Sequence, residues 1–148
     1  MMRSHSKVHL QGRSHSSGVA AFELVCVLPM LITLVFGCVD FGRFGYTYIA
    51  VTNGARAGAD FASTNRYTTA NASNWTAKVR QAVEDEMSQM PGFDSANLTV
   101  ASPAPTQDGI FRLVTVQATY DFRTIVTWPA LPNRVALSRT VGMRVIRG

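Results

Sequence analysis

Residues 18–39 read GVAAFELVCVLPMLITLVFGCV, and this stretch decides the fold of the 148-residue chain. Glu23 is the only charged residue from Val19 to Val39. As a helix that rises about 1.5 Å per residue, the segment from Val19 to Val39 spans about 31 Å, close to the hydrocarbon thickness of a bilayer. The sequence therefore predicts a transmembrane helix over residues 19–39.

The basic residues gather in front of this stretch. Residues 1–18 form a leader with Arg3, Lys7, Arg13, all three histidines and no acidic residue. The leader carries +3 of the chain's net charge of +5, which leaves +2 for residues 19–148. A basic segment before a transmembrane helix keeps the N-terminus in the cytoplasm. The other basic residues are scattered, without the positive stripe that a phosphate backbone requires, so we expect no nucleic-acid partner.

The helix is expected to continue beyond the bilayer. Residues 40–62 contain no proline, and large apolar residues recur there at helical spacing, namely Phe41, Phe44, Tyr48 and Val51. Asp40 and Arg43 lie three residues apart and are expected to pair at the outer membrane boundary. Pro29 is expected to kink the first half gently, which membrane helices tolerate. We therefore predict one long helix with a transmembrane first half and an amphipathic second half.

Small residues recur every four positions in that second half, at Ala50, Gly54, Gly58 and Ala62. Such a stripe lets another helix or a sheet approach closely. It indicates either packing between subunits of a filament or complex, or packing on the protein's own sheet, which we favour. Each glycine weakens the helix by about 1 kcal/mol relative to alanine, so close packing must compensate.

A second amphipathic helix is predicted over residues 74–90, where Pro91 and Gly92 end it. Its apolar stripe comprises Trp75, Val79, Ala82, Val83, Met87 and Met90. The acidic run at residues 84–86 belongs largely to the solvated side. Adjacent acids on a helix point in different directions, and no histidine lies beyond residue 15, so a metal site is not expected there.

After Pro91 the apolar residues alternate, as in strands. Strands are predicted over residues 97–102, 112–122 and 135–145, and Arg139 interrupts the last one. In the second strand the alternation places five side chains on one face: Val114, Val116, Ala118, Tyr120 and Phe122. A small antiparallel sheet of about three strands should therefore lie against the long helix. The apolar loop at residues 125–132 is expected to pack on the domain; contact with a partner or the bilayer surface is the alternative.

The chain offers no catalytic constellation. All three histidines lie in the leader, and the sequence has no phosphate-binding loop, nucleophile elbow or CxxC motif. Cys26 and Cys38 lie about 18 Å apart along one helix, which excludes a disulfide between them. We expect a protein that is not an enzyme and that uses no cofactor, metal or small-molecule substrate.

Several motifs of the long helix resemble those of a known family. Gly18, four small or apolar residues and Glu23, followed by an apolar helix, resemble the prepilin-peptidase motif of type IV pilin-like proteins. Further segments resemble the TadE-like family of minor pilins (pseudopilins), which serves the Tad, or Flp, tight-adherence pilus system. These segments are Leu28-Pro29, Phe36-Gly37, Asp40-Phe41-Gly42-Arg43 and Thr52-Asn53-Gly54-Ala55-Arg56-Ala57-Gly58-Ala59. The resemblance covers residues 18–62. Leu24 departs from it, since the family commonly has an aromatic residue directly after the glutamate.

The resemblance implies cleavage by a membrane prepilin peptidase between Gly18 and Val19. Glycine suits this position because its backbone can enter a narrow cleft. The cut would free a cationic α-amino group on Val19, with which Glu23 can pair in the same chain or in a neighbouring subunit. The alternative is that Glu23 snorkels to the cytoplasmic interface.

The resemblance further implies a type IV pilin-like α+β fold, with a leader (1–18), a transmembrane helix (19–39) and an extracytoplasmic domain (40–148). The implied function is that of a bacterial minor pilin in the assembly of Tad/Flp-type pili for adhesion or secretion. The implied partners are the peptidase, other pilins or pseudopilins and Tad inner-membrane assembly components. The implied location is the inner membrane, with a cytoplasmic N-terminus and a periplasmic or extracellular domain. One alternative is an uncleaved single-pass envelope protein that scaffolds a secretion complex. A secreted protein is disfavoured, because no small-x-small cleavage site follows Val39.

Overall fold

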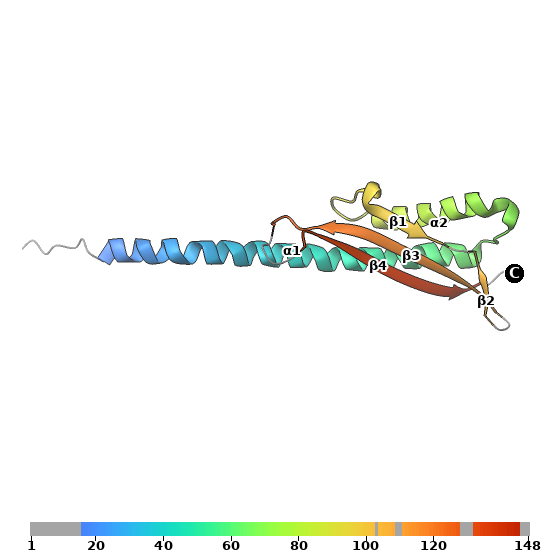
Figure 1. The fold of residues 1–148 in the computed structure, drawn as a ribbon, viewed down its shortest axis with the longest axis horizontal. Coiled ribbons are helices and arrows are strands. Elements are labelled where there is room, and N and C mark those ends of the chain that lie inside the picture. Colours follow the sequence, from blue (N-terminus) through green and yellow to red (C-terminus); the bar gives the residue numbers. More distant parts are fainter. Residues whose placement is uncertain (1–15, 103, 109–110, 128–131, 146–148) are drawn as a thin grey trace, which may run out of the picture. The chain divides into compact units, whose positions relative to one another are not determined.

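The computed structural model describes residues 16–102, 104–108, 111–127 and 132–145. Its elements follow the chain in the order α1 (Ser16–Thr64), α2 (Ala72–Met87), β1 (Leu98–Ala101), β2 (Thr106–Asp108), β3 (Phe111–Arg123) and β4 (Arg134–Arg144). Short 3-10 turns, η1 (Thr69–Asn71) and η2 (Ser95–Asn97), precede α2 and β1. The predicted α+β class is confirmed, with a long N-terminal helix, a second helix and a small antiparallel sheet (Figure 1).

Contacts divide the chain into two units, residues 1–38 and residues 39–148. The described part of the first unit is the first half of α1, in which every side chain from Gly18 to Phe36 is exposed. α1 is long and apolar enough to cross a membrane, with a mean hydropathy of 2.5 over an 18-residue window. It continues through Pro29, and the Thr33 hydroxyl donates a hydrogen bond of 2.8 Å to the Pro29 carbonyl.

The sheet of the second unit is built around β3. β1 pairs antiparallel with residues 117–120 of β3 and β2 with residues 111–113, so the two short strands share one edge. β4 pairs along the other edge, from Leu113 opposite Arg144 to Arg123 opposite Arg134. β2 is an addition to the three predicted strands. Its three residues lie in a stretch interpreted as a loop, because so short a strand shows no alternation.

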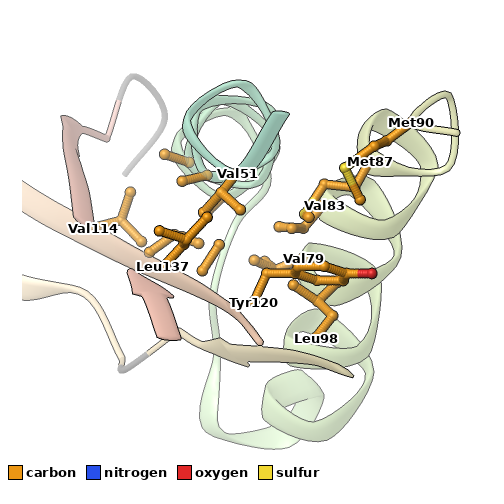
Figure 2. Packing of buried hydrophobic residues seen from close by; sticks show 14 of the residues in the cluster. Val51, Val79, Val83, Met87, Met90, Leu98, Val114, Tyr120 and Leu137 are labelled. Carbon is orange, nitrogen blue, oxygen red and sulfur yellow. The ribbon is translucent and has the colours of Figure 1, made fainter. Parts of the chain in front are cut away.

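The core lies between the second half of α1, α2 and the sheet. All five β3 side chains that were predicted to share a face are buried. Buried side chains of the two helices meet them, namely Val51, Ala55, Ala59 and Ala62 of α1 and Trp75, Val79, Val83 and Met87 of α2. Figure 2 shows Val51, Val83 and Val114 among the side chains that converge from these three elements. Full burial of one such valine or methionine side chain is worth about 1.5–3 kcal/mol, so the second unit has a core of its own.

α2 begins two residues earlier and ends three residues earlier than predicted. Before it, the Thr68 and Asn71 side chains each accept a hydrogen bond from the other residue's backbone N–H, at 3.3 Å and 2.8 Å. This reciprocal cap satisfies amides at the start of η1, the turn that leads into α2. After it, Gly92 has a φ of 74°, which favours glycine. Met90 is buried as predicted, but it lies in this turn and not in α2.

Candidate functional site

The residues of the predicted processing site lie within the first eight residues of α1. Gly18, Val19 and Glu23 are all exposed, and a Cβ placed on Gly18 would meet open space. Among the residues that the structure describes, none forms an ion pair or hydrogen bond with the Glu23 carboxylate. The described chain therefore leaves both the predicted cleavage bond and this carboxylate free for other molecules.

Large apolar side chains surround this site along the first half of α1. Phe22 is 70% exposed and Met30 73% exposed, and the apolar residues between them are similarly uncovered. A continuous apolar surface of this length marks a contact with lipid or with another protein. The first half of α1 thus fits a single-pass membrane segment.

Asp40 lies at the start of the second unit and is 94% buried, with only 6% of its surface exposed. Its Oδ1 accepts a hydrogen bond of 2.9 Å from the backbone N–H of Ile125, and its Oδ2 accepts one of 3.3 Å from that of Val126. Both amides belong to the connection between β3 and β4. A buried carboxylate is stable only where such donors surround it, so Asp40 fastens this connection to α1.

Arg43 contributes to the same junction between α1 and the end of β3. Its Nη1 lies 3.4 Å from Asp40 Oδ1, which confirms that the predicted pair forms. Nη1 also donates a hydrogen bond of 3.5 Å to the Arg123 carbonyl, and the guanidinium lies 5.5 Å from the centre of the Phe122 ring. The pair therefore serves the junction of α1 with the end of β3. Its position relative to a bilayer boundary stays a prediction.

The small-residue stripe faces the interior of the second unit. Gly54, Gly58 and Ala62 are buried, and Ala50 is half-buried. A Cβ on Gly54 would lie 2.8 Å from Met87 Cγ, and a Cβ on Gly58 would lie 2.6 Å from Val83 Cγ2 and 3.2 Å from Val116 Cγ1. The stripe thus contacts α2 as well as the sheet. The favoured prediction had named only the sheet.

The role of one residue of the sheet, Arg139, could not be assigned from the sequence. Arg139, which interrupts the alternation of β4, lies opposite Ala118 on the inward face, and its guanidinium is 4.5 Å from the centre of the Tyr48 ring. Arg139 therefore interrupts the apolar pattern because it makes a cation–π contact with α1.

The apolar loop at residues 125–132 is described only in part. Ile125 is exposed and Val126 is half-buried, while residues 128–131 lie outside the described residues. The predicted packing of this loop therefore stays a prediction.

The described residues hold no group of three or more histidine, cysteine, aspartate or glutamate side chains placed to bind a metal ion. Cys26 and Cys38 are both exposed along the first half of α1.

The comparison with known families gives one finding. The family model described as TadE-like protein matches residues 18–60. This match confirms the resemblance over the part of α1 that holds Gly18, Glu23, Asp40 and Arg43. No curated protein and no solved structure matches the chain.

Proposed function

We propose, from the TadE-like match of residues 18–60, that the protein is a minor pilin (pseudopilin) of a Tad/Flp-type pilus system. The family suggests a pilus-associated protein and is not a known enzyme family. One observation carries the proposal: an exposed apolar helix segment, whose Glu23 has no partner among the described residues, precedes a domain that has its own core. In such a chain the helix can first lie in the membrane and then pack against other subunits, while the domain stays folded.

A prepilin peptidase would cut between Gly18 and Val19. A peptidase binds its substrate in an extended form, so the first turn of α1 must open before cleavage. The first turn of a helix leaves its backbone N–H groups without intrahelical partners, and glycine lowers helix stability by about 1 kcal/mol relative to alanine. Gly18 is therefore the residue of this turn at which opening costs least.

Glu23 would then neutralise the new α-amino group. Glu23 follows Val19 by four positions of the helix, a rise of about 6 Å, which a glutamate side chain can bridge. An unpaired carboxylate inside the bilayer costs several kcal/mol, whereas an ion pair with the amine offsets much of this cost. Glu23 can pair with the α-amino group of the same chain or with that of a neighbouring subunit.

The proposal places the chain in the inner membrane, with its N-terminus in the cytoplasm and residues 40–148 outside. The proposed partners are the peptidase, other pilins or pseudopilins and the membrane components that assemble the pilus. The proposal assigns these partners to the exposed first half of α1, because Gly54, Gly58 and Ala62 are buried in the second unit.

Processing can be tested with Gly18→Leu in cells that contain the peptidase. We expect this variant to stay full length on a gel, while Gly45→Leu, the same change in open space farther along α1, is cut like the unaltered chain. Glu23→Ala should be inserted and cut but should impair pilus assembly. Normal cutting of Gly18→Leu would contradict the processing site and favour an uncleaved envelope protein; normal piliation with Glu23→Ala would contradict the pairing.

A further inference from the structure

β4 lies at one edge of the sheet, and only one side of this strand is paired. Its 11 residues pair with β3 from Arg134 opposite Arg123 to Arg144 opposite Leu113. Among the described residues, no strand pairs with the other side of β4, whereas β1 and β2 both pair with the opposite edge of β3 (Figure 1). In an antiparallel strand the backbone N–H and C=O groups of every second residue point to the same side. About half of the residues of β4 therefore offer these groups to a further strand.

Most of the features that protect an edge against pairing are absent from β4. Proteins protect edge strands by making them short, by prolines and bulges, or by charged side chains. β4 contains no proline, and its register with β3 runs without a bulge. It carries three arginines, Arg134, Arg139 and Arg144, and no acidic residue. The charge of β4 is thus the feature that decides which strands can pair with it.

The inward face of β4 is only partly covered. The inward side chains of β3 from Val114 to Phe122 are all buried, whereas on β4 only Leu137 is. Three further apolar side chains of β4 pack against the core and stay half-buried, namely Val135, Val141 and Met143. Side chains of neighbouring strands contact each other on the same face of a sheet. A further strand beside β4 would therefore remove apolar surface from water, which favours its binding.

The arginines disfavour a second copy of the chain as this strand. In an antiparallel pair of two β4 strands centred on Arg139, the two Arg139 residues would lie opposite each other, and Arg134 would lie opposite Arg144. Like charges directly opposite destabilise a sheet. The described strands cannot supply the complementary charge, because β1 has no acidic residue and β2 and β3 have one each. Within the described residues none of the three arginines forms an ion pair, so their charges are available to acids of another protein.

We propose that the open edge of β4 binds an extended acidic segment of a partner protein, which adds a further strand to the sheet. Backbone hydrogen bonds hold the segment, and its acidic side chains lie opposite the arginines, which are spaced at every fifth position. Its apolar side chains cover Val141 and Met143 on the inward face. This surface belongs to the second unit alone, and the inference is independent of cleavage after Gly18.

The test uses the full chain in detergent micelles and fluorescent peptides as long as β4. In the peptide EVTVTETVTVE, paired antiparallel with β4, the glutamates lie opposite the three arginines and the valines face inward. KVTVTKTVTVK reverses the charge, and EVTPTETPTVE keeps the charge but has prolines that prevent strand pairing. We expect fluorescence anisotropy to show about tenfold tighter binding of the first peptide than of either control.

Charge reversal on the protein provides the matching test. Arg134→Glu combined with Arg144→Glu should invert the preference, so that the lysine peptide binds more tightly, and this binding also shows that the variant is folded. Arg66→Glu combined with Lys78→Glu makes the same change of charge at a hollow between α1 and α2. This control should leave the preference for the acidic peptide unchanged. An equal effect of the two double variants would overturn the proposal, because it would reduce the binding to overall charge.

Hydrogen exchange locates the bound peptide. The acidic peptide should slow exchange at the amides of β4 that point away from β3, and exchange in α2 should stay unchanged. Equal binding of the three peptides, or slowing confined to other elements, would overturn the proposal. Slower exchange at these β4 amides when the chain alone is concentrated would identify a second copy as the partner and would also overturn it.

Discussion

The two halves of α1 have different neighbours although they belong to one helix. From Val19 to Phe36 the helix carries large apolar side chains, and all of them are exposed. From Val51 to Ala62 its inward positions carry small or medium side chains that are at most 1% exposed. Among the described residues, the first half therefore has no packed neighbours, whereas the second half packs against α2 and the sheet. The difference teaches that apolar character alone does not decide which part of a helix belongs to a core.

The largest loss of stability is expected at a methionine that packs against the second half of α1, and a methionine of the first half serves as its control. Met87→Ala removes a fully buried side chain and should lower the free energy of unfolding by about 2–5 kcal/mol. Met30→Ala, at a side chain that is 73% exposed, should change it by less than about 0.5 kcal/mol. Urea unfolding of the detergent-solubilised chain, followed by tryptophan fluorescence, measures both. Equal losses would break the comparison.

An intermediate effect is expected at Asp40. Asp40→Ala removes two backbone hydrogen bonds to a carboxylate, and a hydrogen bond to a charged group is worth about 1.5–3 kcal/mol. Hydrogen exchange at these two amides should become faster, while Asp60→Ala, at an exposed position of the same helix, should leave it unchanged. Unchanged exchange in Asp40→Ala would show that Asp40 does not hold the connection.

The smallest effect is expected from the two buried glycines. In Gly58→Ala the new methyl group meets the stiff valines Val83 and Val116, so crowding should exceed the gain in helix propensity and leave a net loss of about 1 kcal/mol. In Gly54→Ala the new methyl group would lie 2.8 Å from Cγ of the more flexible Met87 and 3.2 Å from Val83 Cγ1, so we expect a loss that is smaller than in Gly58→Ala. Thermal unfolding of both variants measures the difference. A greater loss for Gly54→Ala would contradict the close packing of α2 at Gly58.

Periodic features of the fold could be predicted from the sequence. The alternation from Val114 to Phe122 predicted the buried face of β3, and the spacing from Trp75 to Met87 predicted the buried face of α2. These predictions succeed because burial imposes a period of two on strands and of 3.6 on helices. β2 has three residues and shows no such period, so its pairing with β3 was not predicted.

Long-range polar contacts could not be predicted in the same way. The sequence showed that Asp40 and Arg43 could pair, since they lie three residues apart on a helix. Nothing in the sequence indicates that Asp40 binds the amides of Ile125 and Val126, because backbone donors have no residue-type signature. The stacking of Arg139 on Tyr48 was likewise visible only as an interruption of a pattern. The processing residues Gly18, Val19 and Glu23 came from a motif, and their role stays a prediction.

The most direct test of the central claim is the intact mass of the protein extracted from membranes of cells that contain a prepilin peptidase. The claim is that the exposed half of α1 is a processed membrane segment beside a self-contained domain. It predicts a chain that begins at Val19, with the mass of residues 1–18 missing. A chain that still begins at Met1 in the presence of an active peptidase would contradict it.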